Sequence, residues 1–127
     1  MYKRQAANSY LSRNGGPDGL NDLSHHEFVL PAPIDTRLPI WAWLSENVTD
    51  LKVAIETTDT IAAREAVFAG LGLGILTEFD VAGRDDLTPV LPANPDWDVP
   101  LWLVSHVDLH RTEKVQEMLA RIKALRH

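Results

Sequence analysis

The sequence predicts an α/β fold in which a mostly parallel sheet is flanked by helices. Three consecutive segments support this prediction. Residues 52–56 are short and apolar-rich, residues 61–69 carry apolar side chains at helical spacing, and residues 73–76 form a second apolar strand pattern. Two buried strands joined by a helix form a right-handed parallel crossover, which requires a sheet covered on both faces.

A polar turn separates the first of these strands from the helix. Thr57, Thr58 and Asp59 are three successive candidate N-caps, and Thr60 adds a further hydroxyl. Open α/β sheets bind ligands at the carboxyl ends of their strands, and a helix N-terminus accepts anions. The turn is therefore a candidate ligand site, although helix capping alone is the commonest use of these residue types.

Composition narrows the class of protein. The 127 residues suffice for one core, or for one lobe of a larger structure. A formal net charge of −6 argues against direct nucleic-acid binding, which needs a basic face. The sequence has no cysteine, no apolar run of membrane-spanning length and no signal-peptide pattern, so we expect a soluble cytoplasmic protein.

The first part of the chain predicts only short elements. Residues 1–5 match no pattern in the rest of the sequence, so we interpret them as a possible cloning or assembly scar and exclude them from the fold. Residues 8–13 predict a short helix ended by a Gly-Gly-Pro turn, and residues 20–26 predict a second, weakly helical piece. The apolar residues 28–30 follow and are closed by prolines.

Further strands are predicted on both sides of the crossover. Residues 40–44 alternate, with Trp41 and Trp43 on one face, which indicates a strand. These tryptophans either cover a sheet face, which is the commoner role, or stack on a ligand. Residues 87–91 predict a brief strand, and residues 101–105 predict a central one because they are uniformly apolar.

Metal binding has weak support in the sequence. His106, Asp108 and His110 would share one face of an extended strand, as metal ligands can. The segment leads directly into a helical pattern, however, so a polar strand-to-helix corner is the favoured interpretation. His25 and His26 are adjacent and point apart, which favours a solvated loop pair.

Two other patterns suggest chemistry without supporting it. Gly70, Gly72 and Gly74 resemble a nucleotide-binding loop in composition, but they follow a helix and precede a strand, which is the reverse of the dinucleotide-binding order. Close packing of the helix end against the strand is the favoured role. Glu56 and Asp59 could act as acid and base, but no third group accompanies them.

Several runs of the chain resemble LysR-type transcriptional regulators, specifically the C-terminal part of their effector-binding region. These runs are TTDTIAAREAVFAGLGLGILTEF, LTPVLP and PLWLVSHVDLHRTEKVQEMLARIKAL. The earlier run AANSYLSRNGGPDGLNDLSHHEFVL is also similar, since the family typically shows Ser-Pro-x-Tyr-Leu, a His-Gly turn and Asp-Leu-x-x-His there. The chain departs from the family at Ala7-Asn8, which replace Ser-Pro, at Asn14, which replaces histidine, and at Thr77, which replaces proline.

The resemblance implies one incomplete part of a two-lobed, type 2 periplasmic-binding-protein-like fold that binds its effector between the lobes. Residues 1–27 would be the tail of the first lobe and a connection, and residues 28–107 the second lobe. Residues 108–127 would form a helix that returns to the missing first lobe. The family binds DNA through an N-terminal winged helix-turn-helix, which we expect to lie outside this sequence.

The resemblance also implies a site and partners. Thr57, Thr58, Asp59 and Thr60, with Thr77 on a neighbouring loop, would face the cleft and bind a small effector, often one bearing a carboxylate. It implies no cofactor, no metal, no membrane and no enzymatic activity, and a homo-oligomer in the full-length regulator. The alternatives are a fragment of a two-lobed solute-binding protein, against which the missing signal-peptide pattern weighs, and a small α/β enzyme, which no constellation supports.

The final predicted helix, residues 112–125, has a continuous apolar stripe. The stripe comprises Val115, Met118, Leu119, Ile122 and Leu125. If this helix docks on a lobe that the chain lacks, the stripe is left uncovered. We therefore expect the isolated chain to be marginally stable or to self-associate through this helix.

Overall fold

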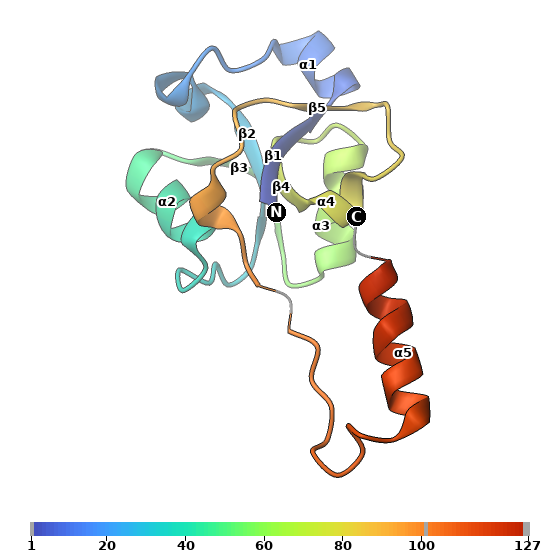
Figure 1. The fold of residues 1–127 in the computed structure, drawn as a ribbon. Coiled ribbons are helices and arrows are strands. Elements are labelled where there is room, and N and C mark those ends of the chain that lie inside the picture. The colour runs from blue at the N-terminus through green and yellow to red at the C-terminus, as the bar shows by residue number, and fades with distance from the viewer. Residues whose placement is uncertain (1, 101, 126–127) are drawn as a thin grey trace.

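A computed structural model describes residues 2–100 and 102–125 of the chain. Its strands are β1 (Tyr2–Ala7), β2 (Glu27–Pro31), β3 (Lys52–Thr57), β4 (Gly74–Thr77) and β5 (Leu87–Pro89). Its α-helices are α1 (Asn8–Asn14), α2 (Pro39–Asn47), α3 (Thr60–Phe68), α4 (Glu78–Val81) and α5 (Glu113–Ala124). Two short 3₁₀ turns, η1 (Leu20–His25) and η2 (Pro95–Trp97), complete the elements (Figure 1).

The strands form two hydrogen-bonded groups joined at one point. β2 and β3 pair in parallel, and β1 pairs antiparallel with both β4 and β5. A parallel bridge between Phe28 and Leu73 links the groups, with the Val29 N–H donating to the Leu73 carbonyl at 2.9 Å. The α/β fold is thus confirmed. The predicted crossover from β3 through α3 to β4 passes over β2, and the sheet is parallel only in part because β1 runs against its neighbours.

The exclusion of residues 1–5 from the fold was wrong. Tyr2 to Gln5 belong to β1, which lies between β4 and β5, and Lys3 pairs with Leu76. Arg4 and Gln5 are buried in spite of their polarity. A strand with polar side chains gives no apolar alternation, so sequence patterns could not reveal this one.

The segment at residues 40–44 is helical, so its prediction as a strand was also wrong. Pro39 occupies the first turn of α2, where a missing N–H costs nothing. Ile40, Trp41 and Leu44 are buried, and this spacing of one and four residues is that of one helix face. A run of five apolar residues fits both the two-residue period of a strand and the 3.6-residue period of a helix. The segment is helical here because its buried residues lie on one helix face.

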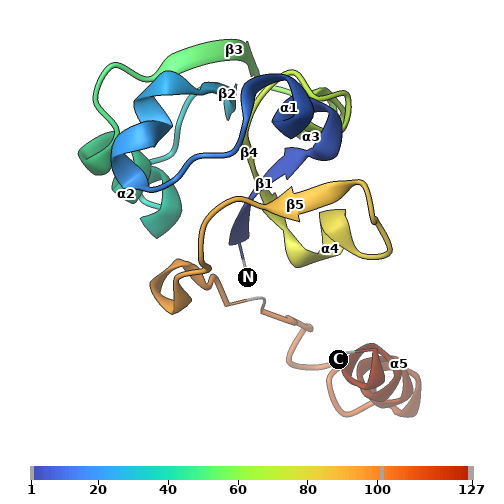
Figure 2. The same ribbon diagram turned by 90° about the horizontal axis from the view of Figure 1, so that it is seen from above.

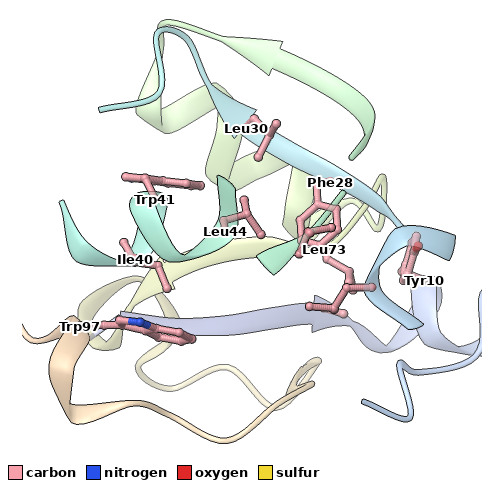
Figure 3. Packing of buried hydrophobic residues seen from close by; sticks show 11 residues of the cluster. Tyr10, Phe28, Leu30, Ile40, Trp41, Leu44, Leu73 and Trp97 are labelled. Atoms are coloured by element: carbon pink, nitrogen blue, oxygen red, sulfur yellow. The ribbon is translucent and has the colours of Figure 1, made fainter. Parts of the chain in front are cut away.

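The sheet is covered on both faces at β2 and β4, but β3, which the sequence predicted to be buried, is an edge strand whose residues are mostly exposed. Phe28 and Leu30 of β2 point into a cluster with Leu44, while Val29 between them packs on the other side with Val67 of α3. Figure 3 shows the first cluster, with Trp97 at one end of it, near Ile40. Its other labelled members are Tyr10, Trp41 and Leu73.

Close approach explains two of the three glycines that follow α3. A Cβ on Gly72 would lie 2.7 Å from the Glu27 carbonyl oxygen, and one on Gly74 would lie 2.2 Å from a Val67 methyl group. The packing role predicted for these glycines is confirmed. Gly70 has a φ of +76°, which favours glycine at the helix end.

The adjacent histidines behave differently from each other. His25 is exposed, as predicted, and its Nδ1 lies 2.9 Å from Asp22 Oδ1. His26 is buried, so the prediction of a solvated pair was wrong for it. Its Nδ1 lies 3.0 Å from the Tyr10 hydroxyl, and its Nε2 lies 3.6 Å from Asp22 Oδ2. The imidazole thus joins α1 to η1 inside the core.

The residues after Trp97 form a C-terminal arm, defined here as residues 98–100 and 102–125. The predicted central strand at 101–105 was wrong for the described residues 102–105, which form no strand: Trp102 is 79% exposed and Val104 is 85% exposed. Residue 101 lies outside the described residues. The helix α5 is confirmed, but Met118 and Ile122 of its apolar stripe are exposed. Both Figures 1 and 2 show α5 lying away from the sheet.

Within the described residues, no helix is both long and apolar enough to cross a membrane. The same residues contain no cluster of histidine, aspartate or glutamate that could hold a metal ion. His106 and Asp108, two of the three residues considered as metal ligands in the sequence, are exposed in the arm.

Candidate ligand-binding cavity

A cavity of about 310 Å³ opens where β2 and β4 end. This position matches the rule that open α/β sheets bind ligands at the carboxyl ends of their strands. The wall combines apolar and polar side chains from β2, α2, α3, β4 and the loop before α2. Its residues are Val29, Pro31, Pro33, Asp35, Leu38, Trp41, Thr60, Ala63, Arg64, Val67, Gly74, Ile75, Leu76, Thr77 and Asp80.

One face of α3 supplies a wall of this cavity. Thr60, Ala63, Arg64 and Val67 are spaced by three, four and seven residues, so they form one stripe along the helix. Val67 is buried against the sheet, Arg64 is partly exposed, and Thr60 lies at the opening of the helix. The stripe therefore runs from an apolar floor to a polar rim.

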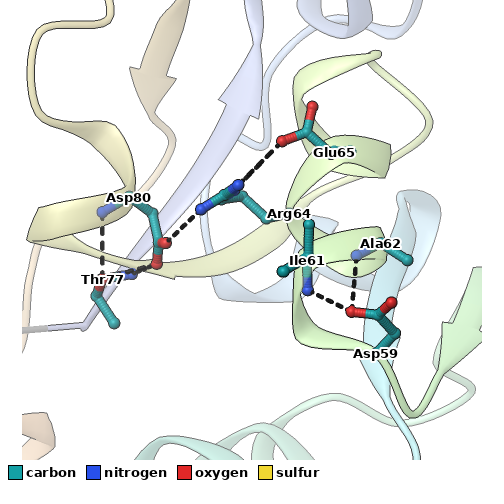
Figure 4. Close-up of polar contacts among 7 residues, drawn as sticks. All are labelled: Asp59, Ile61, Ala62, Arg64, Glu65, Thr77 and Asp80. Atoms are coloured by element: carbon teal, nitrogen blue, oxygen red, sulfur yellow. Dashed lines mark hydrogen bonds and ion pairs between the residues drawn. The ribbon is translucent and has the colours of Figure 1, made fainter.

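The turn before α3 is held by its own side chains. Asp59 is the N-cap, and its Oδ1 accepts hydrogen bonds from the Ile61 N–H at 2.8 Å and the Ala62 N–H at 3.3 Å (Figure 4). Thr57 Oγ1 accepts one from the Asp59 N–H at 3.1 Å. The Asp59 carboxylate therefore already occupies the anion-accepting end of the helix.

Of the sequence-predicted residues, Thr60 and Thr77 lie in the cavity wall. Thr57, Thr58 and Asp59 lie in the turn behind Thr60 and outside the wall. Thr58 is exposed. The structure thus brings together the two threonines that the sequence placed 17 residues apart, one on each of two neighbouring elements.

Thr77 is fixed by a capping box at the start of α4. Asp80 Oδ2 accepts hydrogen bonds from the Thr77 N–H at 2.9 Å and the Thr77 hydroxyl at 2.7 Å, while the Asp80 N–H donates to Thr77 Oγ1 at 3.3 Å. The second oxygen of Asp80 lies 3.7 Å from Arg64 Nη1 (Figure 4). Arg64 also pairs with Glu65 Oε1, at 3.3 Å from Nε and 3.2 Å from Nη2. Both ion pairs join partly exposed or exposed groups and are therefore weak, so Arg64 can exchange them for another anion.

The cavity wall contains two acids and one base. Besides Asp80 and Arg64, Asp35 lies in the wall and forms a two-point pair with Arg37, at 2.8 Å for both Nε–Oδ1 and Nη2–Oδ2. The hydrogen bonds from the Arg37 side chain and backbone lower the pKa of Asp35. Asp35 is therefore held as a carboxylate by Arg37, which leaves Arg64 as the wall's available cation.

Sequence reasoning missed Arg64, Asp35, Asp80 and Trp41 as cavity residues. Two of them carried a usable local signal, because Arg64 lies four residues after Thr60 on the same helix face, and Thr77-x-x-Asp80 is a capping-box pattern. Asp35 and Trp41 carried none, since they reach the site only through the packing of the loop and α2.

A cavity at strand ends, lined by a helix stripe and a few polar groups, has the features typical of small-molecule sites. The family model for the LysR substrate binding domain matches residues 5–126 of the chain. The chain therefore belongs to the LysR substrate-binding domain family. No curated protein matches its sequence.

Solved structures support the same fold. The regulatory domain of CrgA, a LysR-type transcriptional regulator from Neisseria meningitidis, superposes with a TM-score of 0.71 at 18% identity, covering 98% of this chain and 64% of that one. The regulatory domain of AphB from Vibrio vulnificus gives 0.62 at 20% identity, covering 97% and 63%. The CcmR regulatory domain of Synechocystis PCC6803, in complex with 2-PG, gives 0.54 at 18% identity, covering 70% and 45%. The chain thus spans less than two thirds of each of these domains.

Proposed function

We propose that this chain is the effector-sensing portion of a LysR-type transcription regulator, and that the cavity beside Thr60 and Thr77 binds a small metabolite. One observation carries the proposal. In a member of this family, Thr60, at the end of the polar turn predicted from the sequence, lies in the wall of a cavity at the carboxyl ends of β2 and β4. A volume of about 310 Å³ is at the lower end of the range for small-molecule sites.

A carboxylate-bearing effector fits the polar groups of the wall. Arg64 would bind the carboxylate in place of its 3.7 Å contact with Asp80, and the hydroxyls of Thr60 and Thr77 would add hydrogen bonds. Thr57 and Asp59 would act by holding the turn that positions Thr60. The CcmR regulatory domain, which shares the fold, was solved in complex with 2-PG. An effector of this class is therefore the first to test.

The division of the chain follows from this proposal. Residues 1–27 would be a connection from a first lobe, residues 28–107 the second lobe, and residues 108–127 a helix that docks on the first lobe. The opposite wall of the cleft and a DNA-binding winged helix-turn-helix would come from segments outside these 127 residues. Effector binding would favour one lobe arrangement and so change how a homo-oligomer in the cytoplasm binds DNA.

A pair of neighbouring threonines gives a sharp test. Thermal unfolding of the chain is followed with a panel of small carboxylates that includes 2-PG, and binding of any stabilising compound is measured by calorimetry. We expect Thr60→Ala and Arg64→Gln to weaken binding, while Thr58→Ala, which is exposed and outside the wall, leaves it unchanged.

Two outcomes would contradict the proposal. One is that no compound of the panel raises the unfolding temperature. The other is that a stabilising compound binds the Thr60→Ala and Arg64→Gln variants as tightly as the original chain, since its site would then lie elsewhere.

A further inference from the structure

The guanidinium of Arg4 is buried against a pair of tryptophans. Its central carbon lies 4.6 Å from the ring centroid of Trp43 on α2 and 4.4 Å from that of Trp97 on η2. Arg4 belongs to β1, the middle strand of its three-stranded sheet, and the residue is only 6% exposed. The two rings also contact each other, with centroids 5.0 Å apart, so both lie on the same side of the guanidinium, as cation–π contacts.

Most N–H groups of this guanidinium have no acceptor. Nη2 donates to the Pro92 carbonyl at 2.7 Å, whereas Nε and Nη1 are buried without a hydrogen-bond partner among the described residues. Burial lowers the pKa of Arg4 to about 10, so the group is still charged at neutral pH. A buried charged donor without an acceptor is costly and rare in folded proteins, and it indicates a partner that is not part of the fold itself.

Arg4 also lines a cavity of about 520 Å³, separate from the cavity at Thr60 and Thr77. One side of this second cavity is the loop that carries Asp18, and the other is the segment from Leu91 to Trp97. Leu20, Trp43 and Pro92 give it apolar walls. Asp18 is the single acid among its lining residues and Arg4 the single base.

We propose that this second cavity binds a small carboxylate, whose oxygens accept hydrogen bonds from the Arg4 guanidinium while its apolar part lies against the tryptophans. A carboxylate that bridges Nη2 and either Nη1 or Nε forms the two-point pairing that arginine favours. Because Nε and Nη1 are screened from solvent, the segment carrying Pro92 shifts to admit the ligand. This site is independent of the proposed effector site, since the two share no lining residue.

The Nε–H resonance of Arg4 gives a direct test by NMR on the whole chain labelled with ¹⁵N. Sodium acetate is titrated against sodium chloride at matched ionic strength, with inorganic phosphate as a third arm, and the Trp97 indole N–H is followed in parallel. We expect acetate to shift both Arg4 and Trp97 saturably while chloride does not. The Nε–H of Arg121 on α5, which lines neither cavity, serves as the internal reference.

Variants separate the proposal from a purely structural role. Arg4→Lys keeps the charge but loses the two-point geometry, so we expect acetate to bind at least about tenfold more weakly, followed at the Trp97 indole. Asp18→Asn removes a like charge from the cavity wall, so we expect acetate to bind at least as tightly, while the Arg4 resonance of the free chain stays unchanged.

Three results would overturn the proposal. In the first, chloride or phosphate shifts the Arg4 resonance as strongly as acetate. In the second, acetate produces no saturable shift in the original chain. In the third, Asp18→Asn alone moves the resonance and acetate does not, which would make Asp18 the internal partner of Arg4.

Discussion

The packed body, residues 2–97, and the C-terminal arm are built from similar residues and differ in what those residues contact. Leu44 in the body is 1% exposed, and Leu103 in the arm is 47% exposed. Trp97 is 2% exposed, while Trp102, five residues later, is 79% exposed. The apolar patterns are equally clear in both regions. An apolar run therefore predicts burial only where the same chain supplies the opposing surface.

The difference follows from the sheet. The central strand β2 presents its side chains to two covered faces, with α2 over one and α3 over the other. In the arm, α5 has its apolar stripe on one side but no sheet beneath it. Full burial of a single such side chain contributes roughly 1.5–3 kcal/mol, so the stripe holds burial energy that this chain does not realise. The proposed docking of α5 on a first lobe would bury this stripe and gain that free energy.

The largest expected effect is a loss of core packing in the body that has no counterpart in the arm. Leu44→Ala removes a buried side chain of α2, so it should lower the free energy of unfolding by about 2–5 kcal/mol. Leu103→Ala should change it by less than about 0.5 kcal/mol, since that side chain is half exposed. Urea unfolding followed by circular dichroism measures both. Equal losses would show that the arm is packed in solution.

A second expected effect concerns the glycine at the junction of β2 and β4. A Cβ in Gly72→Ala would lie 2.7 Å from a backbone oxygen that cannot move away, so we expect a loss of about 1–3 kcal/mol. Gly19→Ala is the matched control, because a Cβ there meets nothing within 4 Å and its φ of 176° suits any residue. The same urea experiment compares them. A neutral Gly72→Ala would contradict the strand junction described here.

Self-association is a third way to separate the regions. If α5 is uncovered, the chain should associate at high concentration, and Met118→Glu should return it to a monomer without changing its unfolding temperature. Ala120→Glu adds the same charge to the opposite face of α5 and should leave the association unchanged. Light scattering after size exclusion gives the mass. Equal behaviour of the two variants would exclude the apolar stripe as the contact.

The smallest expected effect is a pH dependence within the body. Hydrogen bonds from His25 and from the Asp18 N–H lower the pKa of Asp22. Its contribution to stability is therefore present above the unfolded value of about 3.9 and is lost as the pH falls through the lower folded value. Asp22→Asn should lower the unfolding temperature near neutral pH, and the difference should shrink below about pH 4. Asp85→Asn, at an exposed position, is the control.

Sequence patterns predicted the elements whose signals are local. The Asp59 cap, the helix α3 and the close-packed Gly72 and Gly74 all follow from chemistry within a few residues. Other features depended on distant partners. Arg4 is buried because Trp43 and Trp97 pack against it, and no residue close to it in the sequence predicts this contact. The same contrast holds for the cavity. The polar turn predicted Thr60 as a site residue, whereas Asp35 comes from the separate loop before α2 and has no local sequence signal.

Native-state hydrogen exchange tests the contrast between body and arm most directly. On a sample shown to be monomeric, the amides of β1, β2 and β4 should exchange only through global unfolding, because their ladders lie in the packed body. The amides of α5 should exchange close to the rate of an unfolded peptide, since an isolated helix of 12 residues is marginal in water. Slow exchange throughout residues 115–125, at the rate of the core strands, would contradict the description of the arm as unpartnered.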